Sequence, residues 1–223
     1  MYFASRTQAG RMLASQIAPK YHGQPCAVVA LSDGGAVVGA QIAGALRCVL
    51  SMLLTEEITL PREPDAVAGI SQDGSLSYNT AYSPGEIDEL IGEYYQYIEQ
   101  EKLTRLSNLN HATGNGRTID KRLLEGQNVI VVSDGLASGF AFDVAVAFLK
   151  PVAIKRLIVA TPLASVKAVD RLHVAADEIF CLNVVEDYIS TDHYYDQHDV
   201  PPHEKVVEII ERMLADWRPA STT

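Results

Sequence analysis

Short apolar runs alternate with helical patterns along most of this chain. Aliphatic and β-branched runs that end in polar or glycine-containing turns predict buried strands. Apolar residues spaced three and four positions apart predict helices with one buried face. The predicted strands are 26–31, 48–54, 129–132, 156–160 and 178–182, and the predicted helices are 6–18, 36–47, 141–149, 164–175 and 203–217. This alternation predicts right-handed crossovers, and therefore an α/β fold with a mostly parallel sheet covered by helices on both faces.

A different pattern occupies the middle of the chain. Segments 66–71 and 76–78, joined around Asp73-Gly74, predict a β-hairpin. The following run Ser83-Pro84-Gly85-Glu86 has the residues of a capping box and predicts the start of a helix. An apolar stripe then continues for about six turns, with these members: Ile87, Leu90, Ile91, Tyr94, Tyr95, Ile98 and Leu103. The stretch 107–122 loses this periodicity and is predicted to be a loop.

Composition favours one domain over residues 1–223. The chain is 48% hydrophobic and 21% charged, which is enough to bury one large core, and no linker-like stretch divides it. No apolar run approaches the roughly 18 residues needed to span a bilayer, and the beginning of the chain lacks a signal pattern, so we expect a cytoplasmic protein with no membrane partner. Cys26, Cys48 and Cys181 lie in apolar runs and are expected to be reduced core residues.

The formal net charge of −10 disfavours a broad basic surface for polyanions, so nucleic acid is not an expected partner. A small phosphorylated ligand stays compatible with this charge. Backbone amides and a few local cations can hold one phosphate inside an acidic protein.

The stretch 129–142 is the strongest candidate for such a site. A buried strand is followed by the turn Ser133-Asp134-Gly135, a loop with Gly139, and an apolar helix. Amides at a helix N-terminus suit a phosphate, and Asp134 stands at the carboxyl end of the strand, where parallel sheets usually place ligand contacts. An ordinary turn between a strand and a helix explains the same residues equally well.

This stretch resembles the phosphoribosyl pyrophosphate (PRPP) loop of the type I phosphoribosyltransferases, which typically reads Asp-Asp-Gly-hydrophobic-Ala-Thr-Gly-Ala-Thr. Here the loop reads Ser133-Asp134-Gly135-Leu136-Ala137-Ser138-Gly139-Phe140-Ala141. Asp134 matches the second acid and Ser138 replaces the first Thr. Ser133 replaces the first acid and Ala141 the second Thr. The loop is therefore recognisable but reduced.

The resemblance covers nearly the whole chain. The order of elements matches from Arg6 to Ile210, and the run 6–14 resembles the opening helix of a bacterial subgroup of the family. It implies a Rossmann-like phosphoribosyltransferase fold in a single domain with a small hood, made by lid and hood elements at about 55–82, 107–122 and 183–202. A homodimer is expected by the same analogy.

A second turn resembles the family's pyrophosphate turn, Pro-Arg-Gly-Gly. Here it reads Ser32-Asp33-Gly34-Gly35, so an acid stands where the family has Arg. Asp33 would repel pyrophosphate unless Mg²⁺ lies between them, or it makes a local Asx-turn in a site that has decayed. The acidic segment 55–57 lies where the family usually has an Arg-Lys pair. A dinucleotide fingerprint does not fit, because Gly34, Gly35 and Gly39 lack its spacing.

Two further segments have candidate roles. The loop 107–122 matches the family's active-site lid, and Arg117 could reach a phosphate, although a plain surface loop fits as well. The segment 183–202, which we call the hood segment, contains His and carboxylate residues but no spacing typical of a metal site, so no protein-bound metal is predicted. Its pair Tyr194-Tyr195 matches an aromatic pair of the family's hood.

The resemblance implies a protein that binds a 5-phosphoribosyl ligand, either PRPP or a nucleotide. Residues 135–139 would hold the 5′-phosphate and Asp134 the ribose hydroxyls. In an active enzyme Asp134 would be the catalytic residue, and phosphoribosyl would pass from PRPP, carried with Mg²⁺, to a nitrogenous base. The alternative is a catalytically degenerate regulatory protein that binds PRPP or a nucleotide. A hydrolase fits poorly, because Ser138 is one position too late for Gly-x-Ser-x-Gly.

Overall fold

The structure is a computed structural model that describes residues 2–63, 65–112 and 119–216. The chain forms two compact units. The first contains residues up to 52, 119–139 and those from 152 onward, and the second contains 53–118 and 140–151. The single domain expected from the sequence stays a prediction.

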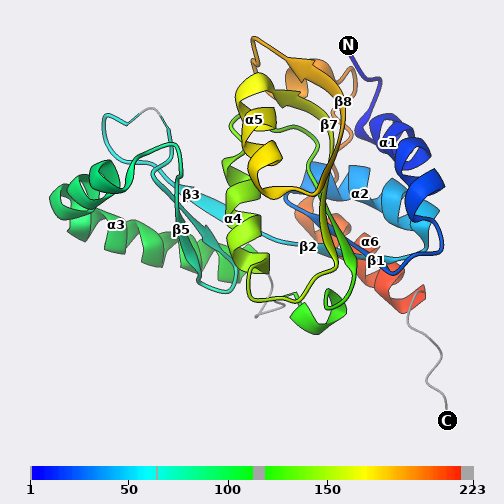
Figure 1. Cartoon of the computed structure of the whole chain (residues 1–223), viewed down its shortest axis with the longest axis horizontal. Helices are drawn as coiled ribbons and strands as arrows, with labels where there is room; N and C mark the ends of the chain where they lie inside the picture. Colours follow the sequence, from blue (N-terminus) through cyan, green and yellow to red (C-terminus); the bar gives the residue numbers. More distant parts are fainter. Residues whose placement is uncertain (1, 64, 113–118, 217–223) are drawn as a thin grey trace. The chain divides into compact units, whose positions relative to one another are not determined.

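The first unit is built on a five-stranded sheet in which every strand pair is parallel (Figure 1). Its order is β2-β1-β6-β7-β8. The bounds are β1 Cys26–Ala30, β2 Val49–Met52, β6 Asn128–Val132, β7 Arg156–Ser165 and β8 Glu178–Val185. The register places Val28 beside Ile130 and Ile130 beside Ile158, so these apolar side chains share one face of the sheet. The predicted α/β fold with a mostly parallel sheet is confirmed.

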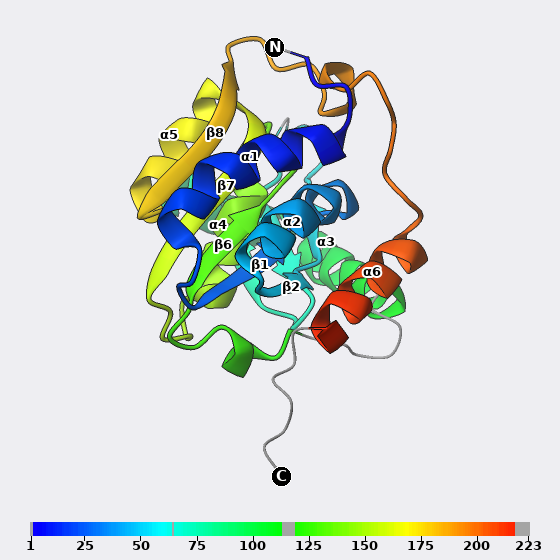
Figure 2. The same ribbon diagram turned by 90° about the vertical axis from the view of Figure 1, so that its right-hand side faces the viewer.

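Helices cover both faces of this sheet. Helices α1 (Arg6–Tyr21), α2 (Asp33–Leu46) and α6 (His203–Asp216) lie on one face, and α5 (Val166–Ala175) lies on the other (Figure 2). The core on the first face joins all three helices to the sheet, and its members include Leu13, Ile17, Ile42, Leu50, Ile130, Ile158 and Val206. Leu13, Ile17 and Val206 belong to the apolar helix faces that the helical spacing predicts.

The strand order creates a switch point at the middle of the sheet. From β1 the chain continues outward to β2 on one side, whereas β6, β7 and β8 follow each other on the other side. The carboxyl ends of β1 and β6 are therefore neighbours whose following turns lead apart. Ligands of open parallel sheets bind at such a point.

The second unit has an antiparallel sheet of its own, in the order β3-β4-β5. The strands are β3 Thr55–Ile58, β4 Ala68–Ser71 and β5 Leu76–Tyr78, and helices α3 (Pro84–Ala112) and α4 (Phe140–Leu149) pack against them. The predicted hairpin is β4-β5. The capping box is also confirmed, because Ser83 N donates to Glu86 Oε2 at 2.7 Å and Glu86 N donates to Ser83 Oγ at 3.4 Å.

Several boundaries differ from the sequence-based prediction. Helix α2 starts at Asp33 instead of 36, because Ser32 Oγ accepts a hydrogen bond from Gly35 N at 2.8 Å and caps the helix there. Helix α3 continues to Ala112, so 107–112 is helical and the predicted loop is wrong over those residues. Strand β7 runs to Ser165, and α5 therefore begins at Val166, later than predicted.

The predicted stripe on α3 is only partly buried. Ile87 and Ile98 are buried, whereas Tyr95 is 61% and Leu103 69% exposed. The helix kinks at Tyr94, whose φ of −111° and ψ of 22° are not helical. Ile98, after the kink, is still buried with Ile87 in one cluster, so only part of the stripe is lost.

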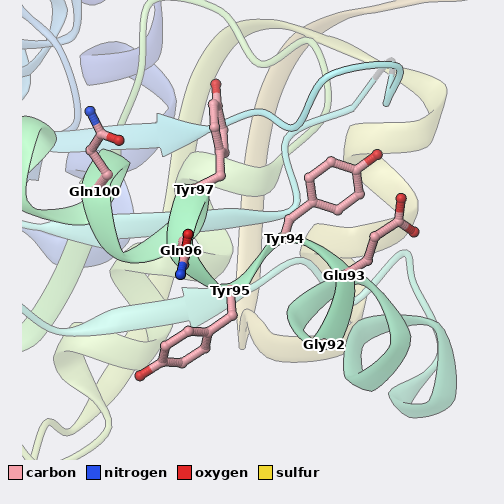
Figure 3. A pocket seen from close by; sticks show the side chains of 7 residues that line it. All are labelled: Gly92, Glu93, Tyr94, Tyr95, Gln96, Tyr97 and Gln100. Atoms are coloured by element: carbon pink, nitrogen blue, oxygen red, sulfur yellow. The ribbon is translucent and has the colours of Figure 1, made fainter.

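A hollow lies at the kink of α3, and Figure 3 shows Tyr95 and Tyr97 pointing to opposite sides of the helix there. Its lining residues are Gly92, Glu93, Tyr94, Tyr95, Gln96, Tyr97 and Gln100. Among these lining residues the only formal charge is the acid Glu93, so the hollow is a poor site for a phosphate.

The three cysteines are free thiols, with Cys26 and Cys48 buried and Cys181 half-buried, which agrees with the expectation of reduced residues. Burial raises the pKa of Cys48 to about 12. No helix in the described part of the chain is long and apolar enough to cross a membrane.

Glu178 at the start of β8 provides a test of how α1 is held to the sheet. Its carboxylate accepts hydrogen bonds from Lys20 Nζ and Tyr21 Oη, both at 2.5 Å. Burial acts to raise the pKa of Glu178, but these two bonds outweigh it and the pKa is lowered. Because the folded pKa is depressed, the stability that it contributes is present at neutral pH and is lost as the pH falls through that pKa.

We expect Glu178→Gln to lower the free energy of unfolding by about 1 kcal/mol at pH 7. The variant and the wild type should converge once the pH has fallen through the lowered pKa of Glu178, because the protonated carboxyl no longer differs in charge from the amide. Urea unfolding across this pH range measures the difference. The exposed Glu89→Gln is the charge-matched control, and a Glu178 effect that persists unchanged at low pH would contradict the assignment.

Candidate functional site

Asp134 stands at the switch point, two residues after the end of β6. Its carboxylate is buried and accepts two hydrogen bonds, from Arg6 Nε at 2.7 Å on Oδ2 and from Ser32 Oγ at 2.8 Å on Oδ1. Arg6 opens α1, and Ser32 caps α2. The Asp134 carboxylate therefore connects the turn after β6 to the start of α1 and the start of α2.

Arg6 is 2% exposed and faces three carboxylates. Besides Asp134, it pairs through Nη2 with Asp192, and its Nη1 lies 3.9 Å from Asp199 Oδ1. The guanidinium carbon lies 4.4 Å from the centre of the Tyr195 ring. Burial acts to lower the pKa of Arg6, but the hydrogen bonds to Asp192 and Asp134 outweigh it and the pKa is raised. The buried side chain therefore stays positively charged.

The first turn of α2 lies directly against this ion pair. A Cβ atom on Gly34 would lie 2.0 Å from Asp134 Oδ2 and 2.7 Å from Arg6 Nε, and one on Gly35 would lie 2.9 Å from Val132 O. Neither position leaves room for a side chain, so both require glycine. The turn after β1 and the turn after β6 thus meet at the switch point.

The loop after Asp134 is fastened to β7 by its backbone. Leu136 N donates to Leu163 O at 3.0 Å, and Ser165 N donates to Leu136 O at 2.9 Å. Ser133 Oγ donates to Gly135 O at 2.9 Å and accepts from Gly135 N at 3.2 Å. The amides of Gly135 and Leu136 are therefore engaged inside the protein.

The second half of the loop lies against the beginning of α5. Ser165 Oγ donates to Ala137 O at 2.6 Å and caps α5 by accepting from Ala168 N at 3.0 Å. Gly139 has a φ of +76°, and a Cβ there would lie 3.3 Å from Ala168 Cα and 3.4 Å from Arg171 Cδ. The side chain of Arg171 therefore lies beside the loop at Gly139.

The hood segment covers the start of the loop. A Cβ on Gly135 would lie 2.5 Å from Tyr188 Oη and 2.9 Å from Thr191 Oγ1. Tyr195 Oη donates to the backbone carbonyl of Asp134 at 2.6 Å. The pKa of Tyr195 is raised, mainly by burial and also by the nearby charge of Asp134. Tyr194 and Tyr195 are both buried and pack with Phe3, so their rings belong to the core of the first unit.

The remaining predicted site residues have other surroundings. Asp33 Oδ1 lies 2.8 Å from His203 Nδ1 at the start of α6, so its carboxylate contacts a helix terminus. Arg117 lies outside the described residues. Among the described residues, no group of three or more His, Cys, Asp or Glu is arranged to hold a metal ion.

Comparison with known proteins identifies the family. Residues 4–198 match the phosphoribosyl transferase domain family. The chain belongs to this family. It is 26% identical over 219 residues to "Putative phosphoribosyl transferase Rv0571c" of Mycobacterium tuberculosis, a match that covers 98% of this chain and 48% of that protein. A protein of the same description from another strain of the species, MT0597, matches equally. The chain therefore spans about half the length of these curated relatives.

Among solved structures, the phosphoribosyl transferase domain is similar to TT1426 from Thermus thermophilus. The TM-score is 0.71 and the identity 25%, and the match covers 98% of this chain and 100% of that one. The likeness therefore extends through nearly the whole of both chains.

Sequence reasoning on this phosphoribosyl transferase domain missed three residues, Arg6, Ser32 and Arg171. A signal existed for Arg6, because a cation in the first turn of a helix opposes the helix dipole and needs a partner elsewhere. Ser32 was assigned to a turn before a helix starting at 36, so neither its cap on α2 nor its bond to Asp134 was predicted. Nothing in the pattern of α5 distinguishes Arg171 from an ordinary exposed cation.

The ion pair of Arg6 predicts a stability effect at Asp134. We expect Asp134→Asn to lower the free energy of unfolding by about 3 kcal/mol, because it removes the charge that compensates a buried guanidinium. Asp192→Asn is the matched control, since it pairs with the same guanidinium from an exposed position and should cost less than about 1 kcal/mol. Equal losses in the two variants, measured by urea unfolding, would contradict the central role of Asp134.

Proposed function

We propose that this chain binds a 5-phosphoribosyl ligand at the switch point between β1 and β6. One observation carries the proposal: the turn with Gly34 and the turn with Asp134 meet there without room for a single Cβ atom. Both turns resemble ligand-binding segments of the family, and the carboxyl ends of the two strands are adjacent.

The 5′-phosphate is assigned to the second half of the loop, residues 137–139. The amides of this part follow those already engaged by Ser133 and Leu163. The N-terminus of α5, capped by Ser165, lies beside it, and the side chain of Arg171, a residue with a positive charge, has its Cδ close to Gly139. Amides, a helix N-terminus and a guanidinium all favour a phosphate dianion.

The ribose is assigned to Asp134. A carboxylate offers about four lone-pair positions, and Arg6 and Ser32 occupy two of them in the protein. The others can accept hydrogen bonds from ribose hydroxyls. In a transfer reaction the same negative charge would stabilise the positive charge that develops on the sugar ring.

For the reaction, we propose the chemistry of the family, with displacement of pyrophosphate from the anomeric carbon by a nitrogenous base. Mg²⁺ enters this proposal with PRPP, as part of the substrate. The second candidate is a regulatory protein that binds a nucleotide or PRPP without transfer. The replacement of the family's first acid by Ser133 and of its Arg by Asp33 favours this candidate. A cytoplasmic location and a homodimer remain predictions.

Calorimetric titration with PRPP plus magnesium, ribose 5-phosphate and AMP tests the binding proposal. Clearly tighter binding of PRPP would favour the transferase, since only PRPP carries a pyrophosphate on the ribose. Equal affinity for all three, or binding of AMP alone, would favour the regulatory protein. No binding of any of the three would overturn the assignment of the site.

Gly139 gives a sharp test of the phosphate loop. We expect Gly139→Ala to weaken ribose 5-phosphate binding about tenfold, because a Cβ at a φ of +76° strains the loop and pushes against Ala168. Gly126→Ala is the matched control, since its φ is +70° and no atom lies within 4 Å of the added Cβ. Both variants should lose about 1 kcal/mol of stability, but only the first should lose affinity. Equal affinities would remove Gly139 from the site.

A further inference from the structure

Arg6 carries a charge arrangement that the binding of ribose and 5′-phosphate does not explain. One buried cation faces the three carboxylates of Asp134, Asp192 and Asp199. Its Nη1 is buried and has no hydrogen-bond partner among the described residues. A buried, unpaired donor costs free energy, so a guanidinium left in this state is suited to a further anion.

The three carboxylates differ in how firmly they are held. Asp134 is buried and also bound to Ser32. Asp199 accepts hydrogen bonds from Arg6 N at 3.1 Å and Thr7 N at 3.4 Å, and so caps the start of α1. The Asp192 side chain is 61% exposed, and its pKa is lowered by the hydrogen bond from Arg6. Asp192 is therefore the carboxylate that an incoming anion can replace at least cost.

The position of the guanidinium fits a ligand that spans both turns. Arg6 Nε is 2.7 Å from where a Gly34 Cβ would lie, at the N-terminal turn of α2. This turn resembles the family's pyrophosphate turn, with Asp33 in place of the family's Arg. Asp33 contacts His203. The cation beside Gly34 is Arg6, which belongs to α1.

We propose that the guanidinium of Arg6 binds the pyrophosphate group of the ligand. Asp192 pairs with Arg6 Nη2 until the pyrophosphate displaces it. The inference rests on the proposed function, because it gives the same site a second anion position. Displacement also acts on the hood segment, since Tyr188 and Thr191 of that segment cover Gly135. An anion that replaces Asp192 therefore removes one ion pair of the segment that lies over Gly135.

The test compares Asp192→Asn with Asp196→Asn, titrated with inorganic pyrophosphate plus magnesium and, separately, with ribose 5-phosphate. Asp196 is an exposed acid four residues further along the hood segment, so its replacement makes the same change in net charge. We expect Asp192→Asn to bind pyrophosphate about tenfold more tightly than the wild type, because a competing and repelling carboxylate is gone. Asp196→Asn should bind it like the wild type, and ribose 5-phosphate affinity should change little in either variant.

The outcomes separate this inference from the proposed function. Equal pyrophosphate affinity in the two variants, whether unchanged or raised alike, would overturn the role of Arg6 and Asp192. That conclusion holds whether or not ribose 5-phosphate binds. A selective gain in Asp192→Asn without any ribose 5-phosphate binding would support the inference and overturn the proposed ribosyl site.

Discussion

The ion pair between Arg6 and Asp134 is the interaction on which the arrangement at the switch point depends. Two buried charges are stable together only when each is compensated and hydrogen-bonded. Ser32 and the Tyr195 ring complete this environment, and Gly34 lies so close that it has no space for a side chain. One pair thus fixes the start of α1, the turn after β6 and the first turn of α2.

The acidic residues expected near the pyrophosphate position have local partners in the structure. Asp33 contacts His203, and Glu56 in the second unit pairs with Arg105 at 3.2 Å. The sequence suggested that these acids only replace lost cations, but each carboxylate has a local partner. The turn at Gly34 has a cation beside it, but that cation comes from the beginning of the chain.

The loop after β6 has a structural role, and the proposed function gives it a binding role as well. Its first amides are used to attach it to Ser133 and β7, and this attachment orients the later ones beside α5. The reduced motif is consistent with this division, because Gly139 keeps the left-handed conformation while Ser133 turns its hydroxyl inward. Rigid support from neighbouring backbone is what a preorganised anion site needs.

The sequence by itself determined the five strands, the helices between them and the parallel sheet, because apolar periodicity and capping residues act over a few positions. It also placed Asp134 at the end of a central strand and marked Gly34 and Gly35. It could not place Arg6, which pairs with Asp134 across 128 positions, or Arg171, whose proximity to Gly139 depends on the packing of α5. Only the tertiary structure decided these contacts, because charges far apart in the chain meet through the register of strands and the packing of helices.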